Sequence, residues 1–390
     1  MTFNFDTPID RMGTYCTQWD YVQDRFGKAG LLPFTISDMD FAAPAPVMEA
    51  LKARLEHPVL GYSRWNHDDF KGAIESWYQR RFDVQIDKDT IVYGPSVIYI
   101  IAKLIEKWSH AGDGVVFQTP AYDAFDKLVE GAGRRCVRNP LIKTASGWEI
   151  DWNLLETQLA EADTTIFLLC SPHNPTGRVW QKEELQRIAE LCDEHDVALI
   201  SDEIHMDVAF KAHTPWTGFG MTQRWALVTS ASKSFNIPAL NGAYAFIAEE
   251  KARNDYLFKL KEVDGLSSPS ILGVIGMMAA YNHGEEWLNA LNAYVRDSHG
   301  IVRDTLSVFP ELNYVVPDAT YLAWIDLSPL NLDMQKLQSD LIEHFNVAIM
   351  DGSVYGESGK GYVRLNLGCP RSKVEAGLKA LIEAIKRQRP

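Results

Sequence analysis

Lys233 lies in the segment TSASKSF (229–235), where it follows the apolar stretch 226–230. Serine hydroxyls and backbone N–H groups at the turn from a strand into a loop suit a phosphate. A lysine held in a dry cleft can also lose its proton and form an imine with a carbonyl group. Because most lysines are solvated surface groups, this segment alone does not establish a site.

Two other polar residues also follow apolar stretches. Asp202 lies at the end of the stretch 197–203, where a carboxylate needs a hydrogen bond or a positive partner. A protonated pyridine nitrogen would be such a partner, and a role as a helix N-cap is the alternative. Asn174 follows the apolar run 164–170, and Pro175 holds its backbone extended. Its amide can then donate to a ring oxygen or a carboxylate, unless the segment is only an Asn-Pro turn.

Tyr122 and Arg364 complete the set of candidate residues. Tyr122 follows the expected strand 114–118, so it can stack on a planar ring or simply begin a helix. Arg364 lies inside the apolar stretch 362–368 and cannot lose its charge, so it requires an anion. A substrate carboxylate would serve, and so would a structural Asp or Glu. Doubly wound folds bind ligands at the carboxyl ends of their strands, where several of these residues are expected.

Short apolar strands and helical patterns alternate from about residue 90, and these elements must position the candidate residues. A helix is expected to open at Ser96, after the first strand. The alternation predicts an α/β fold in which a mostly parallel sheet lies between helices. The expected strands are 90–94, 114–118, 164–170, 197–203, 226–230 and 242–247.

The pattern changes after residue 285 and predicts a second, smaller α+β domain. A long helix (285–309) and a strand (320–327) precede another helix, short strands and a C-terminal amphipathic helix. We therefore expect a large domain over 46–285 and a small domain over 286–390. Residues 1–45 carry many loop signals and are expected to pack on the small domain.

Charge and composition exclude several classes of protein. Lys and Arg number 38 and Asp and Glu 52, a net charge of −14, whereas nucleic acids and anionic membranes favour a basic face. The longest apolar run, 271–280, is far shorter than the roughly 20 residues that span a bilayer. The first residues lack the apolar core of a signal peptide, and five scattered cysteines are typical of free thiols in a reducing compartment. These features predict a soluble, cytoplasmic protein.

Common cofactor and metal motifs are absent from the sequence. No GxGxxG follows a strand, Gly359-Lys360 lacks the rest of a P-loop, and no HExxH occurs. Asp202, Glu203 and His205 are close in sequence, but no second cluster of ligand types supports a metal site. We therefore expect no metal.

The order and spacing of Tyr122, Asn174, Asp202, Lys233 and Arg364 resemble those of the fold-type I enzymes that use pyridoxal 5′-phosphate (PLP), in the aminotransferase class I/II superfamily. Within it, the chain resembles the MalY/PatB group of cystathionine β-lyases, also called cysteine-S-conjugate β-lyases. The resemblance covers essentially the whole chain and implies PLP as the cofactor. The closer likeness is carried by ISDMDF (36–41), GYSRW (61–65), YGPSVIY (93–99), TPAYDAF (119–125), SDEIHMD (201–207), SKSFNIPAL (232–240), DGLSSPS (264–270) and TYLAW (320–324).

The resemblance implies a role for each candidate residue. Lys233 would hold PLP through an imine, Asp202 would keep the pyridine nitrogen protonated, and Tyr122 would stack on the ring. Asn174 would donate to the phenolic oxygen of the ring. Together, Arg364 and Asn174 would bind the α-carboxylate of the substrate.

The resemblance also implies where the phosphate of PLP would bind and that a second subunit would contribute to that site. Tyr62 would reach the phosphate of the neighbouring subunit, which implies a homodimer with shared active sites. Asp38 is expected at the substrate, without a specified role. The phosphate would lie at the turn that opens the helix, held by groups of Ser96, Val97, Ser230 and Ser232.

Two positions depart from the aspartate-aminotransferase pattern. His205 stands where that pattern has a tyrosine, three residues after the aspartate. Asn241 stands where it has an arginine, eight residues after the lysine. His205 would be a neighbour of the ring oxygen, and the phosphate site would carry less positive charge.

The function implied by the resemblance is a PLP-dependent carbon–sulfur β-lyase, which cleaves L-cystathionine and related cysteine S-conjugates to a thiol, pyruvate and ammonia. The same residues permit transamination, so a PLP-dependent aminotransferase is the first alternative. The second is a regulatory protein of the MalY type, which binds a transcriptional activator besides or instead of catalysing a reaction. The presence of Lys233 and Asp202 favours catalysis.

Overall fold

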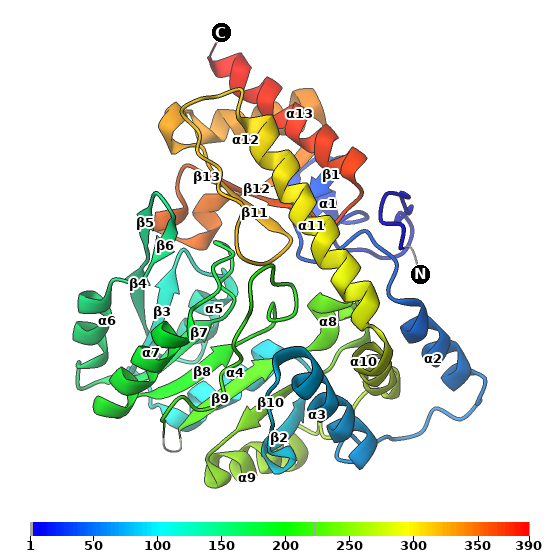
Figure 1. The fold of residues 1–390 in the computed structure, drawn as a ribbon, viewed down its shortest axis with the longest axis vertical. Coiled ribbons are helices and arrows are strands. Elements are labelled where there is room, and N and C mark those ends of the chain that lie inside the picture. Colours follow the sequence, from blue (N-terminus) through cyan, green and yellow to red (C-terminus); the bar gives the residue numbers. More distant parts are fainter. Residues whose placement is uncertain (1–2, 222–223, 390) are drawn as a thin grey trace.

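The computed structural model describes residues 3–221 and 224–389, and within them the chain folds around two main sheets. The larger sheet has the strand order β2-β10-β9-β8-β7-β3-β4 (Figure 1). Its neighbouring strands are parallel, except that β10 is antiparallel to both β2 and β9. This confirms the predicted α/β fold with a mostly parallel sheet. The strands are β2 (Ile91–Gly94), β3 (Gly114–Thr119), β4 (Arg135–Pro140), β7 (Thr164–Cys170), β8 (Ala198–Asp202), β9 (Trp225–Thr229) and β10 (Ala243–Ile247).

The strands of the larger sheet coincide with the apolar stretches of the sequence, except the edge strand β4, whose sequence RCVRNP is largely polar and was not predicted as a strand. Every residue of β8 and nearly every residue of β7 is buried, as expected of strands that are covered on both faces. Full burial of each Leu or Ile side chain in them contributes about 1.5–3 kcal/mol to folding. The helices and the hairpin that accompany this sheet are α2 (Ala45–Leu55), α3 (Asp68–Phe82), α4 (Val97–Trp108), α5 (Ala124–Gly131), α6 (Trp152–Leu159), α7 (Lys182–Glu194), α8 (Ala231–Ser234), α9 (Glu250–Phe258), α10 (Ile271–His283), β5 (Ile142–Thr144) and β6 (Gly147–Glu149).

The smaller sheet has the strand order β1-β12-β13-β11, and β1, from the N-terminal part of the chain, pairs parallel with β12. Helix α11 runs from α10 to α12 along this part of the molecule (Figure 1). It continues through Gly300 without a break. Although α11 is 22 residues long, none of the helices in the described ranges combines the length and the apolar character needed to cross a bilayer. The elements are α1 (Val22–Phe26), β1 (Leu32–Phe34), α11 (Glu285–Leu306), β11 (Leu322–Asp326), α12 (Met334–Phe345), β12 (Val347–Asp351), β13 (Tyr362–Asn366) and α13 (Arg371–Gln388).

A close contact between α10 and the loop after α8 fixes one wall of the site. A Cβ atom on Gly273 would lie 2.5 Å from the carbonyl oxygen of Asn241 and 2.7 Å from that of Leu240. Only glycine therefore fits at this position of α10. The contact holds Asn241 in place, at a positive φ of 57° and a ψ of 170°, a backbone conformation that is rare for residues other than glycine.

Candidate active site

A cavity of about 220 Å³ lies where strands of the larger sheet end and α4 begins. Cys170 and Asp202, the last residues of β7 and β8, are paired in register and both line it. This is the edge at which doubly wound folds bind ligands. A larger cavity, of about 560 Å³, contains none of the predicted site residues. The smaller cavity brings together Ser96, Val97, Tyr122, Asn174, Asp202, His205, Ser230, Ser232 and Lys233.

Lys233 occupies the short helix α8, directly after β9. Its Nζ donates a hydrogen bond to the carbonyl oxygen of Ser37 at 2.6 Å. Burial, with a smaller contribution from the charge of Arg364, lowers the pKa of Lys233 to about 8, while Asp38 and Asp202 oppose the shift. About a tenth of the amine is therefore neutral at pH 7, far more than for an ordinary lysine, and the neutral form is the one that a nucleophile or base requires.

The carboxyl group of Asp202 lies at the floor of the cavity. Its Oδ1 accepts a hydrogen bond from the Ile204 N–H at 3.1 Å. Its other oxygen accepts none from the residues that the structure describes. Burial raises the pKa of Asp202 to about 7, although the hydrogen bond from Ile204 and the charge of Lys233 oppose the shift. The group thus suits a ligand that brings a positive charge, such as a protonated ring nitrogen.

The start of α4 forms the end of the cavity that suits an anion. The Ser96 hydroxyl accepts a hydrogen bond from the Tyr99 N–H at 3.2 Å and so begins the helix, whose first N–H groups are directed outward from its end. The Ser230 hydroxyl donates to the Gly242 carbonyl and accepts from the Ser232 N–H, so the turn itself uses it. The Ser232 hydroxyl has no such partner in the described ranges. Asn241 lines the cavity beside these groups, where no arginine is present.

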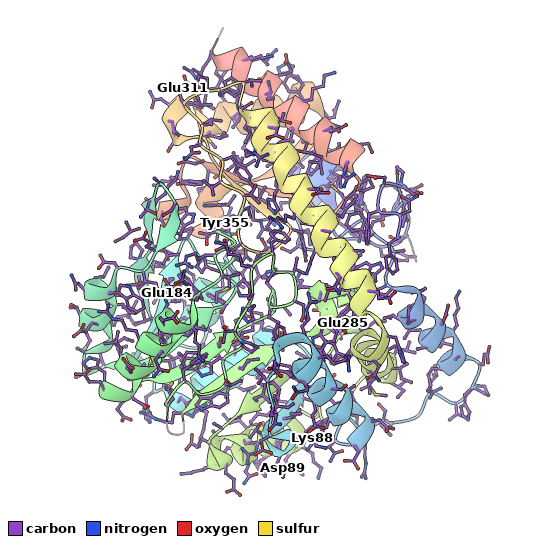
Figure 2. All side chains as sticks on the ribbon, in the orientation of Figure 1. Lys88, Asp89, Glu184, Glu285, Glu311 and Tyr355 are labelled. Carbon is purple, nitrogen blue, oxygen red and sulfur yellow. The ribbon has the colours of Figure 1, made fainter. Side chains whose placement is uncertain are left out.

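Arg364, at 3% exposure, lies on β13 of the smaller sheet, beside the cavity but not in its lining. It donates to Asn174 Oδ1 at 3.2 Å and to the Thr35 carbonyl at 3.0 Å. Its guanidinium carbon lies 4.8 Å from the ring centre of Tyr355, which Figure 2 shows in the region between the two sheets. No acidic side chain among residues 3–221 and 224–389 pairs with it, and its buried Nε has no hydrogen-bond partner there. Arg364 is thus available to a carboxylate ligand rather than held by a structural Asp or Glu.

Tyr122 and His205 complete the walls of the cavity. The Tyr122 ring meets Phe125 edge-on, with ring centres 6.0 Å apart. His205 is buried, and its Nδ1 has no hydrogen-bond partner in the described part of the chain. Burial, together with the charges of Lys233 and Arg364, lowers the pKa of His205 to about 3. The imidazole is therefore neutral and can meet a ring oxygen through an N–H group.

Three predicted residues do not line the cavity: Tyr62, Asp38 and Arg364, of which Arg364 contacts the lining residue Asn174. Tyr62 is 99% exposed and reaches no other site residue in this chain. Asp38 does not line the cavity; its Oδ2 accepts a hydrogen bond from Arg11 at 2.6 Å, and its Oδ1 is buried without a partner in the described ranges. Its charge nevertheless acts on Lys233.

A segment near the N-terminus crosses the site, and its backbone contacts were not predicted from the sequence. We call residues 35–41 the strap. Asn236, near Lys233, binds the strap through both amide atoms, at the Met39 N–H and at the Met39 and Phe41 carbonyls. Asn366, on β13, donates to the carbonyls of two other strap residues. Most of the strap lies in the string ISDMDF, but its contacts are made largely by backbone atoms, which leave no sequence signal.

Comparisons with known proteins agree with this geometry. Residues 29–381 match the family model described as aminotransferase class I and II. Protein MalY of Escherichia coli (strain K12) is 54% identical over 98% of this chain and 99% of its own length. Cystathionine beta-lyase PatB of Bacillus subtilis (strain 168) is 35% identical over 98% of this chain and 100% of its own length. The crystal structure of the PLP-bound C-S lyase from Staphylococcus hominis matches with a TM-score of 0.92 and 28% identity, over 99% of this chain and 98% of that one.

The family match spans most of the chain, and the two curated relatives are aligned over nearly their whole length. The chain therefore belongs to the aminotransferase class I and II family of fold-type I enzymes, within the group that contains MalY and PatB.

Proposed function

We propose that the chain is a PLP-dependent carbon–sulfur β-lyase, which cleaves L-cystathionine and related cysteine S-conjugates to a thiol, pyruvate and ammonia. The observation that carries the proposal is the cavity that the Lys233 amine and the buried Asp202 carboxyl group line together. Arg364 lies next to it, bonded to the lining residue Asn174. The names of the relatives favour a lyase over an aminotransferase, since PatB is a cystathionine beta-lyase and the Staphylococcus hominis protein is a C-S lyase.

The cavity fits PLP at three independent points. The buried carboxyl group of Asp202, with one oxygen free, suits the protonated ring nitrogen. The first N–H groups of α4 and the Ser232 hydroxyl suit the phosphate. The Lys233 amine suits the aldehyde, and the unpartnered His205 Nδ1 and Asn174 suit the ring oxygen.

The chain's own residues then control binding, orientation and proton movement. PLP, when bound, supplies the electron sink that lets the Cα–H and Cβ–S bonds of the substrate break. Lys233, as a neutral amine, takes the Cα proton onto Nζ. Asp202 keeps a proton on the ring nitrogen, and Arg364 fixes the α-carboxylate so that the Cα–H bond faces the amine.

The first prediction concerns the products. With L-cystathionine as the sole substrate, the protein is expected to release homocysteine, pyruvate and ammonia in equal amounts, without an added keto acid. A thiolate at Cβ can depart once Lys233 has taken the Cα proton, before a proton returns to the cofactor. Pyruvate is measured with lactate dehydrogenase and the thiol with a chromogenic disulfide. Pyruvate that forms only with 2-oxoglutarate, or a preference for alanine or aspartate, would identify an aminotransferase instead.

The second prediction concerns Arg364. Replacing it with alanine is expected to raise KM and also to lower kcat, each by about tenfold or more, because a loosely held substrate misaligns its Cα–H bond. Arg364→Lys keeps the charge but loses the two parallel hydrogen bonds, so it should lie between Arg364→Ala and the wild type. Steady-state kinetics with L-cystathionine give both constants. A change in kcat alone would contradict a role in binding the carboxylate.

A homodimer with shared active sites is the second part of the proposal. Tyr62 lies in an exposed loop with Val59 and Leu60, and a hydrogen bond from the Ser63 hydroxyl to the Pro269 carbonyl joins this loop to the segment before α10. Neighbouring exposed apolar side chains of this kind are typical of a protein interface. Tyr62 would then complete the phosphate site of the second copy.

The third prediction tests this arrangement. Lys233→Ala and Tyr62→Ala chains, each inactive alone, are expected to regain part of the wild-type activity when mixed, because one hybrid site then contains both native residues. Up to about a quarter of the wild-type activity is expected for random pairing in equal amounts, since half of the dimers are hybrids and each has one intact site. In the control mixture, Lys233→Ala is combined with Lys261→Ala, which changes an exposed lysine outside the proposed site. A fully active monomer in sedimentation would disprove the shared site.

We also propose the division into residues 1–45, a large domain over 46–285 and a small domain over 286–390. The two largest clusters of buried apolar side chains are centred on the two main sheets and support it, although the larger cluster also takes in Phe5, Phe41 and Leu322. Binding of a transcriptional activator stays a prediction from the resemblance to the MalY type, and catalysis does not depend on it.

A further inference from the structure

The carbonyl oxygen of Ser37 accepts two hydrogen bonds inside the site. One comes from Lys233 Nζ at 2.6 Å and the other from the Tyr321 hydroxyl at 2.9 Å. These donors come from the two sides of the strap: Lys233 from the end of the larger sheet, and Tyr321 from the start of β11 in the smaller sheet. The amine of Lys233 is therefore held by an acceptor that Tyr321 also binds.

Tyr321 is fixed on all sides. Its side chain is fully buried, its ring meets His205 edge-on with ring centres 6.2 Å apart, and its carbonyl accepts from the Leu367 N–H at 2.7 Å. The residue before it, Thr320, has φ 73°, a conformation that is rare for a β-branched residue and costs free energy.

The backbone around Thr320 holds that conformation in place. The Thr320 N–H donates to the Val208 carbonyl at 2.8 Å, and the Thr320 carbonyl is bonded to the His299 imidazole at 2.9 Å. The Thr320 hydroxyl accepts from the Leu322 N–H at 3.2 Å. Strained backbone of this kind persists only where the surroundings over-determine it, and it is concentrated at functional sites. Here it sets the direction of the Tyr321 side chain.

We propose that Tyr321 is a positioning residue for Lys233: its hydroxyl holds the Ser37 carbonyl as the acceptor for the lysine amine whenever that amine is not bonded to the cofactor. This inference rests on the proposed function and adds a residue to it. The amine must be free twice, before PLP is captured and while it carries the substrate's proton. At both times the Ser37 carbonyl oxygen can accept a hydrogen bond from the Lys233 amine, and the Tyr321 hydroxyl holds that carbonyl in position.

The bond from Tyr321 also competes with the bond from the lysine. A carbonyl that already accepts from a phenol is a weaker acceptor for an ammonium group, so Tyr321 favours the neutral amine. The charged groups that face Lys233 are Asp202 from β8, Asp38 from the strap and Arg364 from β13, and His205 beside it is neutral. None of these groups changes when the phenol is removed.

The test is the capture of PLP by the cofactor-free protein, which requires no lyase activity. In this step the neutral Lys233 amine adds to the PLP aldehyde and water leaves. For the wild type, the rate constant is expected to rise with pH and to level off above about pH 8, following the neutral fraction of the amine. For Tyr321→Phe the midpoint is expected to rise by about 0.5 to 1 pH unit, so that capture at pH 7 slows about three- to tenfold.

A second measurement follows the removal of the Cα proton from an amino acid. The rate at which the holoenzyme exchanges the Cα hydrogen of L-alanine in D2O, observed by NMR, is expected to fall about tenfold or more in Tyr321→Phe. KM for L-cystathionine should stay within about twofold, because Arg364 keeps its bonds to Thr35 and Asn174. Tyr244→Phe is the matched control: it removes a buried phenol that bonds Tyr281 at 2.9 Å, away from the strap.

These measurements distinguish a positioning role of Tyr321 from a purely structural one. A midpoint and an exchange rate in Tyr321→Phe equal to those of Tyr244→Phe would overturn the proposal. If Tyr321→Phe does not fold, 3-fluorotyrosine can be placed at position 321, because it keeps the shape of tyrosine and is a stronger hydrogen-bond donor. The pH midpoint of PLP capture should then fall. An unchanged midpoint would again overturn the proposal. A failure of the wild type to release pyruvate from L-cystathionine would instead count against the proposed function, since PLP capture is measured independently.

Discussion

Replacing Lys233 with alanine is expected to lower kcat with L-cystathionine by more than about 10⁴-fold. In the cavity that the structure describes, Lys233 is the sole lysine in the lining, so no second amine replaces it as the attachment point or the base. Borohydride reduction of the wild type, followed by peptide mapping, should place the reduced PLP label on the peptide that contains Lys233.

Small primary amines offer a sharper test of the same residue. Methylamine is expected to restore part of the activity of Lys233→Ala, because the truncated side chain leaves space beside the Ser37 carbonyl for a free amine. The restored rate should increase with pH as the neutral fraction of methylamine increases. Lys261→Ala, which removes an exposed lysine, should match the wild type throughout. A label on another lysine, or unchanged turnover in Lys233→Ala, would contradict the assignment.

The residues of the cavity that sequence could locate are those that follow strands. Asn174, Asp202 and Lys233 each come at or just after an apolar run, and parallel pairing in register aligns the ends of those runs. Cys170 pairs with Asp202, and Asp202 with Val228, so the polar residues meet at one edge. A short stretch of sequence was therefore enough to predict both the strand and the residue at its end.

The residues that sequence could not locate act through the backbone or over long separations. The acceptor for Lys233 is the carbonyl of Ser37, 196 positions earlier in the chain, and every residue type offers a carbonyl there. The lack of an acidic partner for Arg364 is likewise a property of the packing. Asp38 was expected at the substrate from resemblance alone, whereas its contact with Arg11 depends on how the N-terminal segment folds back.

The other large effect is expected at Asp202. Asp202→Asn should still capture PLP on Lys233 but lower kcat by about 10³-fold or more, because an amide cannot stabilise a proton on the ring nitrogen while electrons move onto the ring. The asparagine keeps an oxygen for the Ile204 N–H, so the turn after β8 stays intact. Asp304→Asn, at an exposed position, is the control. Near-normal turnover in a variant with full PLP content would contradict the role of Asp202.

The cofactor-free protein gives an independent measure of the same carboxyl group. Burial raises the pKa of Asp202 from 3.8 to about 7, so the folded state retains a proton that the unfolded state loses. The contribution of Asp202 to the free energy of unfolding therefore decreases as the pH rises from about 4 to about 7, by on the order of 1.4 kcal/mol for each unit of pKa shift. Asp202→Asn carries no titrating group, so relative to the wild type it should gain stability as the pH rises from about 4 to about 7, the range of that titration. Urea unfolding of both cofactor-free proteins at the two ends of this pH range tests the expectation. Bound PLP should remove the difference in pH dependence between the two proteins, because it supplies a positive charge beside the carboxylate. An equal pH dependence in the two proteins would mean that Asp202 is already ionised and paired without the cofactor.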